Sequence, residues 1–186
     1  MLVTAKQSLA PSTLVKKFGL VLCAATLITI AAKVQIPFWP VPMTLHTLAV
    51  LTLSVALGPR LGFAAMATYL AAGLSGLPVF SGSPERGIGF AYAMGPTGGY
   101  LIGYLLASWL TPTLAASGNL LRTGAAMLIG LAVTYICGLL WLTAFVPASN
   151  LVATGLTPFL FGDLVKVALS VALICGWQSF AKGRNP

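Results

Sequence analysis

The sequence predicts an all-α integral membrane protein with six membrane-spanning helices and both termini in the cytoplasm. Three observations predict this class: a shortage of charged residues, a series of long apolar runs, and a one-sided distribution of Lys and Arg. Only 6% of the 186 residues are charged and 58% are hydrophobic, whereas soluble domains carry about 25% charged residues. A soluble fold would have too little polar surface, whereas a surface that faces lipid must be apolar.

The length of the chain limits the number of spans. Each spanning helix needs about 20 apolar residues, so 186 residues allow six or seven spans at most and leave no room for a second, soluble domain. We therefore expect a single transmembrane domain over residues 1–186. The predicted spans cover approximately residues 14–32, 44–57, 61–77, 98–115, 123–146 and 158–180.

The first two spans need separate justification. Lys16 and Lys17 lie at the start of the first run, as in a secretory signal peptide, but the run is longer than a secretory apolar core and lacks a clear cleavage site. A retained first helix is therefore expected rather than a cleaved signal. Three prolines, Pro37, Pro40 and Pro42, separate it from the second run because they cannot continue a helix. The second run is short and should be tilted or partly below the membrane surface.

The distribution of cations predicts the orientation. If the N-terminus is cytoplasmic, only Lys33 and Arg86 fall in outer loops, and Lys166 lies within the sixth span. The positive-inside rule therefore places both termini in the cytoplasm. The only acids, Glu85 and Asp163, then lie towards the outer face. The cations on the cytoplasmic side are Lys6, Lys16, Lys17, Arg60, Arg122, Lys182 and Arg184.

Several functional classes are disfavoured by the same composition. The net charge of +8 is scattered along the chain rather than grouped into a basic stripe, which argues against nucleic-acid binding. The three cysteines lie in apolar segments and are interpreted as packing residues, not as disulfide or metal ligands. The chain has neither a P-loop nor an H-E-x-x-H motif, so we expect no bound nucleotide or metal cofactor. The cysteines are Cys23, Cys137 and Cys175.

One enzyme motif remains as an alternative. The stretch Gly73-Leu74-Ser75-Gly76 matches the G-x-S-G motif of rhomboid-type intramembrane serine proteases. In those proteases the catalytic histidine follows the serine, whereas His46 precedes Ser75. A turn at the end of the third span explains Ser75 better, so we do not expect an enzyme.

Asp163 and Lys166 are charged residues predicted to lie well inside the sixth span. Thr157 and Pro158 are typical of a helix start, which puts Asp163 about 9 Å into the sixth helix with Lys166 on the same face. An unpaired charge at this depth costs at least about 2.5–3.5 kcal/mol. The pair is either a structural ion pair or part of a polar ligand site, and we favour the ligand site.

The outer loops and His46 supply the other candidate ligand-binding residues. His46 is either a packing residue or a ligand contact, and aromatic side chains could form apolar walls. Gly98 and Gly99 open the fourth span, where free N–H groups favour an anion, and Arg86 is an alternative anion partner. The full candidate set is Trp39, Thr44, His46, Phe80, Arg86, Tyr92, Gly98, Gly99, Tyr100, Asp163 and Lys166.

Short blocks along the chain resemble a known family. The stretch Val41-Pro42-Met43-Thr44-Leu45-His46-Thr47-Leu48 is similar to the V-P-x-T-L-Q-T-L stretch of the biotin-specific BioY proteins. These are substrate-capture subunits of energy-coupling-factor (ECF) vitamin transporters, and the similarity covers roughly residues 14–180. Further matching blocks, in the family's order, are residues 57–62, 76–80, 95–103 and 162–166.

The resemblance implies a function and a set of partners. It implies a six-helix ECF S-component in a bacterial or archaeal cytoplasmic membrane that binds biotin with high affinity for uptake. The expected partners are membrane lipid, a transmembrane coupling subunit and two ATP-binding-cassette ATPases, with a homo-oligomer also open. Capture of another small vitamin and a structural subunit without ligand are the alternatives.

The resemblance also implies roles for particular residues. His46 takes the place of a ligand-contacting glutamine, Asp163 and Lys166 hold the ligand's polar ring, and the loop before Gly95 closes the pocket. The family's first helix carries an A-x-x-x-A face that docks the coupling subunit, and here only Ala25 and Thr29 offer that spacing.

Overall fold

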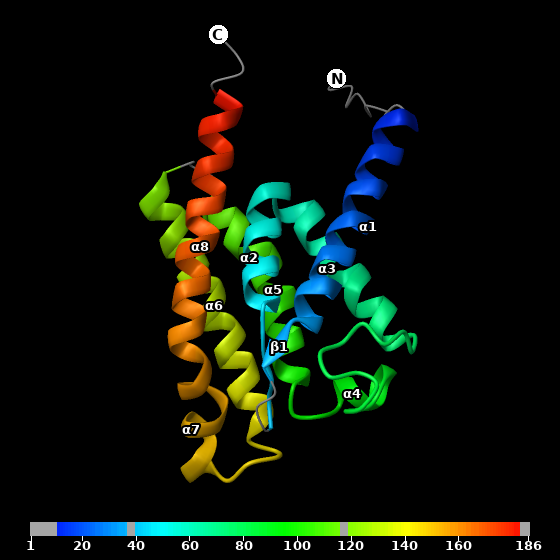
Figure 1. Ribbon diagram of the computed structural model, residues 1–186, viewed down its shortest axis with the longest axis vertical. Helices are drawn as coiled ribbons and strands as arrows, with labels where there is room; N and C mark the ends of the chain where they lie inside the picture. The colour runs from blue at the N-terminus through cyan, green and yellow to red at the C-terminus, as the bar shows by residue number, and fades with distance from the viewer. Residues whose placement is uncertain (1–10, 37–39, 116–118, 183–186) are drawn as a thin grey trace, which may run out of the picture.

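The chain forms a bundle of helices (Figure 1), in a computed structural model that describes residues 11–36, 40–115 and 119–182. A helix lies over each of the six predicted runs. Trp39 falls outside the described residues. These six helices are α1 (Pro11–Lys33), α2 (His46–Leu57), α3 (Pro59–Leu74), α5 (Gly98–Leu114), α6 (Leu120–Leu142) and α8 (Thr157–Lys182).

The helices differ in their capacity to cross a membrane. Within the described residues, three helical segments are long and apolar enough to do so alone: Thr13–Lys33, Leu120–Leu142 and Ala148–Trp177. The predicted count of six crossings therefore stays a prediction. α1 begins and α8 ends at the same end of the molecule (Figure 1).

The helix boundaries follow local chemistry. α6 begins at Leu120, three residues earlier than predicted, because the Asn119 side chain accepts a hydrogen bond from the Leu121 amide at 2.9 Å. The sequence suggested that Thr157 caps the start of α8. In the structure Thr157 is instead the first residue of α8. A short helix, α7 (Leu151–Gly155), precedes it, and the Thr157 hydroxyl donates to the Val152 carbonyl at 3.1 Å.

The Pro-rich break forms a small hairpin. Strand β1 (Gln35–Ile36) pairs antiparallel with β2 (Met43–Thr44), and Gln35 lies opposite Thr44. α2 consequently begins at His46 and not at Thr44, whose hydroxyl accepts a hydrogen bond from the His46 amide at 3.2 Å. Two further short elements were not predicted: α4 (Gly89–Ala93) and the 3-10 helix η1 (Ala148–Asn150).

Small residues let the helices approach closely. A Cβ on Gly103 of α5 would lie 2.6 Å from the Cα of Thr134 in α6, so only glycine fits at that crossing. On α1, Ala25 is 8% exposed and packs in a cluster with Ala65 and Met66 of α3. Ala25 is turned inward, where its small side chain serves contact between α1 and α3, and its predicted role in docking a coupling subunit stays a prediction. The neighbouring Thr29 hydroxyl donates to the Ala25 carbonyl at 2.9 Å.

Candidate ligand-binding site

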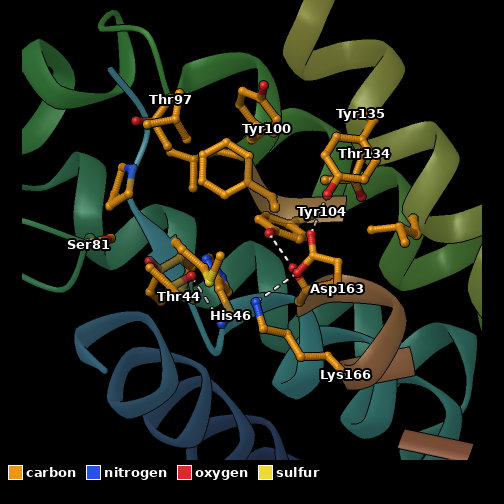
Figure 2. A pocket seen from close by; sticks show the side chains of 18 of the residues that line it. Thr44, His46, Ser81, Thr97, Tyr100, Tyr104, Thr134, Tyr135, Asp163 and Lys166 are labelled. Carbon is orange, nitrogen blue, oxygen red and sulfur yellow. Dashed lines mark hydrogen bonds and ion pairs between the residues drawn. The ribbon is translucent and has the colours of Figure 1, made fainter. Parts of the chain in front are cut away.

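A cavity lies between the hairpin, the short helix α4 and the helices α2, α3, α5, α6 and α8 (Figure 2). About 560 Å³ of space between atoms belongs to it, a figure that includes the open solvent at its mouth. Its walls combine aromatic side chains with a few polar groups. The lining residues are Val41, Pro42, Met43, Thr44, His46, Thr47, Tyr69, Ser81, Tyr92, Thr97, Tyr100, Leu101, Tyr104, Leu131, Thr134, Tyr135, Phe159, Asp163 and Lys166.

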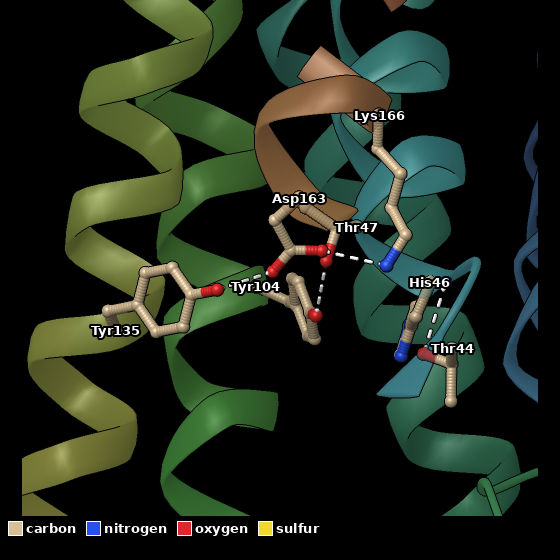
Figure 3. A network of polar contacts seen from close by, with 7 residues as sticks. All are labelled: Thr44, His46, Thr47, Tyr104, Tyr135, Asp163 and Lys166. Atoms are coloured by element: carbon tan, nitrogen blue, oxygen red, sulfur yellow. Dashed lines mark hydrogen bonds and ion pairs between the residues drawn. The ribbon is translucent and has the colours of Figure 1, made fainter. Parts of the chain in front are cut away.

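A buried ion pair forms the polar part of the cavity (Figure 3). The Lys166 ammonium lies 2.8 Å from Oδ1 of Asp163, and the two residues are 7% and 5% exposed. The phenol of Tyr135 donates to the other carboxylate oxygen, Oδ2, at 2.7 Å. The two carboxylate oxygens of Asp163 are thus held by separate hydrogen bonds, one from Lys166 and one from Tyr135.

The helices explain how these groups meet. Asp163 and Lys166 are three residues apart on α8, so they share one face of the helix. Tyr135 comes from α6 and was missed from sequence. Its signal was present: Leu131, Thr134, Tyr135 and Gly138 recur at helical spacing, and all four are buried.

A second polar cluster surrounds His46 at the start of α2. The hydroxyls of Thr47 and Tyr104 lie 2.8 Å apart, and the His46 ring lies 4.5 Å from the Tyr104 ring and 5.0 Å from the Tyr69 ring between centroids. His46 is 3% exposed, and its Nε2 has no hydrogen-bond partner among the described residues. A buried polar atom of this kind is costly unless a ligand or water satisfies it.

The aromatic wall has two layers. Tyr92 lines the cavity, and Phe80 stacks behind it with 5.0 Å between ring centroids. Phe80 is fully buried and contacts Tyr69 edge-to-face, so it supports the wall rather than lining the cavity. Burial raises the pKa of Tyr92, which keeps its hydroxyl protonated as a donor.

The two predicted anion partners are placed differently. The Gly98 amide donates to the Gly95 carbonyl at 3.0 Å, and Gly98 and Gly99 pack against Trp141 of α6. These glycines therefore serve packing between α5 and α6 and do not line the cavity. Arg86 does not line it either, and its Nη1 donates to the Pro40 carbonyl at 3.2 Å.

Hydrogen bonds fasten the hairpin region to the loop that follows α3. The Lys33 ammonium donates to the Ser83 carbonyl at 2.7 Å, and the Ser81 hydroxyl donates to the Gln35 side chain at 2.6 Å. The contact of Arg86 with Pro40 joins the same two segments. Together they hold the loop before Gly95 against the hairpin region, and the closing of the pocket by this loop stays a prediction.

The protease alternative gains no support from the geometry. Ser75 is an exposed residue at the end of α3, and its hydroxyl donates to the Ala72 carbonyl at 2.8 Å. The ring contacts of His46 are with Tyr69 and Tyr104. Among the described residues, no group of three or more His, Cys, Asp or Glu side chains could hold a metal ion.

Comparison with known proteins gives a consistent result. A family model described as the BioY family matches residues 4–182. A protein named probable biotin transporter BioY from Pyrococcus horikoshii is 34% identical over 158 residues, which cover 85% of this chain and 93% of that protein. The biotin transporter BioY of Thermotoga maritima is 34% identical over 152 residues, covering 79% and 86% respectively.

A solved structure shares the fold. The crystal structure of the S-component for biotin from an ECF-type ABC transporter superposes with a TM-score of 0.80. The match covers 92% of this chain and 95% of that chain, at 26% sequence identity.

Proposed function

Because this chain belongs to the BioY family, we propose that it is the biotin-binding S-component of an ECF-type transporter and captures biotin for uptake across the cytoplasmic membrane. The observation that carries the proposal is the Asp163–Lys166 pair, buried in the wall of a cavity that is lined by aromatic and polar side chains. Intramembrane charges of this kind are a functional site by default.

The polar groups complement the ureido ring of biotin. That ring has two N–H donors and one carbonyl acceptor. An ionised carboxylate accepts at about four lone-pair sites, so Asp163 can bind the ring N–H groups while Tyr135 and Lys166 still hold it. The Lys166 ammonium has three N–H donors and can also donate a hydrogen bond to the ring carbonyl. The unsatisfied Nε2 of His46 offers a further contact on the opposite wall.

The rest of the ligand fits the remaining walls. The thioether ring and the aliphatic chain would pack on Tyr92 and Tyr69, since aromatic side chains supply large apolar surfaces. Arg86 stays the proposed partner of the biotin carboxylate although it does not line the cavity, because a guanidinium has five N–H donors and its contact with Pro40 uses only Nη1. The Gly98 amide already donates to Gly95, which disfavours the alternative at the start of α5.

We further propose that both termini are cytoplasmic and that the cavity opens to the outside. The cation distribution supports this orientation. Lys16 and Lys17 lie near the start of α1, and Arg60 and Arg122 begin α3 and α6. Multi-pass insertion in the cytoplasmic membrane follows from the same argument.

Concentrative uptake requires an energy source that this sequence does not encode by a P-loop. We propose a coupling subunit and two ATP-binding-cassette ATPases as partners. The pure chain should then show no ATPase activity. Undiminished uphill biotin transport by the pure chain in ATP-free liposomes would contradict this part of the proposal.

The central test is the identity of the bound molecule. The purified protein is denatured, the released small molecules are analysed by mass spectrometry, and biotin binding by stripped protein is measured by titration calorimetry. Biotin in the released fraction and saturable one-to-one binding support the proposal. Release of a different vitamin, or no binding heat with biotin, overturns it.

A further inference from the structure

The side of the bundle formed by α3 and α5 is short. α3 has 16 residues and α5 has 17, which corresponds to about 24–26 Å at 1.5 Å per residue. The hydrocarbon core of a bilayer is about 30 Å thick. α6, with 23 residues, reaches about 34 Å. On the α3 and α5 side, other residues must therefore supply apolar surface at one boundary of the membrane.

Exposed apolar side chains continue past the end of α3. α4 lies beside the lower ends of α3 and α5, at the end of the molecule opposite the start of α1 (Figure 1). We call the exposed set the α4 patch. Its side chains are between 45% and 68% exposed: Leu74 45%, Leu77 54%, Ile88 47%, Phe90 68% and Met94 48%.

The short helix α4 has two different faces. Phe90 and Met94 are four residues apart and therefore share a side of the helix. Tyr92 is rotated by about 200° from Phe90 and lies on the opposite side, where it is 4% exposed and lines the cavity. One face of α4 thus forms a wall of the ligand site, and the other presents its largest apolar side chain to the surroundings.

We propose that the α4 patch inserts into membrane lipid at the outer boundary of the bilayer and completes the apolar thickness that α3 and α5 lack. The patch carries no charge, and it adjoins the lipid-facing end of α3. A Cβ on Gly89 would lie 3.5 Å from the Leu74 carbonyl, so the start of α4 rests directly on that end. Exposed apolar patches without such a partner are rare in proteins.

A consequence concerns the loop that precedes α4. In this loop Glu85 is exposed and Arg86 is half-buried. These two residues would then stay at the aqueous surface, and Phe90 would lie in lipid. Lipid then contacts the outer face of the helix whose inner face is the Tyr92 wall. The Gly-rich segment is therefore both a loop over the cavity and a membrane anchor.

The proposal can be tested by spin-label accessibility in liposomes. Cys23, Cys137 and Cys175 are first replaced by Ala, and a nitroxide is attached to Phe90→Cys or, as its matched control from the same segment, Glu85→Cys. The Phe90→Cys label should collide more often with lipid-soluble oxygen than with a water-soluble nickel chelate. The Glu85→Cys label should show the reverse preference.

Two outcomes would overturn the proposal. Nickel accessibility at Phe90→Cys equal to that at Glu85→Cys would place the patch in water, with the bilayer thinned around α3 and α5 instead. Low accessibility to both reagents would show that protein covers the patch, either a second copy or a partner subunit. Met94→Cys provides a second labelling site on the same face if Phe90→Cys does not fold.

Discussion

The phenol of Tyr135 donates to Oδ2 of Asp163 at 2.7 Å and so joins α6 to α8 at the wall of the cavity. The other carboxylate oxygen is held by Lys166 from within α8. The carboxylate therefore has a set orientation before any ligand arrives. Such preorganisation reduces the entropy that binding would otherwise cost.

Replacing Tyr135 with Phe should weaken biotin binding by about tenfold or more. A hydrogen bond to a charged group is worth about 1.5–3 kcal/mol, and 1.4 kcal/mol corresponds to about one decade in affinity. Titration calorimetry on the folded variant measures the effect. Tyr100→Phe is the comparison variant: it removes a hydroxyl from another cavity residue, one that donates to the Gly155 carbonyl at 2.7 Å and not to the ion pair. Equal losses for the two variants would contradict a special role for Tyr135.

Breaking the ion pair should affect stability and binding together, whereas removing both charges should separate them. Asp163→Asn leaves the Lys166 charge buried, which costs about 3–5 kcal/mol of stability, and biotin affinity should fall at least about tenfold. The double variant Asp163→Leu with Lys166→Met should regain most of the stability, because no charge remains buried, yet should not bind biotin. Thermal unfolding and calorimetry check both effects. Parent-like binding by the double variant would make the pair purely structural.

His46 should tolerate Gln but not Leu. His46→Gln keeps a polar group beside Tyr104, so its biotin affinity should stay close to that of the parent. His46→Leu fills a similar space without a polar atom, and a ligand group left unsatisfied costs about 1–3 kcal/mol, or roughly five- to a hundredfold in affinity. Calorimetry on the two variants decides the matter. If His46→Leu binds like the parent, His46 is a packing residue.

The orientation can be tested independently of the ligand. A reporter fused to the C-terminus that is active only in the periplasm should stay silent, while a cytoplasmic reporter at the same position should be active. The physical basis is the excess of Lys and Arg in one set of loops. A strong periplasmic signal would place the cavity on the cytoplasmic side.

Part of the candidate site was predictable because it depends on local spacing. Asp163 and Lys166 stand three residues apart on a predicted helix, so their shared face followed from the sequence. Thr44, His46, Tyr92 and Tyr100 were also proposed and do line the cavity. Phe80 was expected in the wall and instead supports it from behind.

Contacts between helices were not predictable in the same way. The chain's composition determined that it is a membrane protein, and its short blocks determined the family that it resembles. Only the tertiary structure decided that Tyr135 holds Asp163, that Ala25 faces α3, and that Gly98 packs against Trp141. The reason is that these helices are apolar on the lipid side and on the core side alike. Their hydrophobic pattern therefore carries little information about rotation around the helix axis, which close packing of small residues and buried hydrogen bonds sets instead.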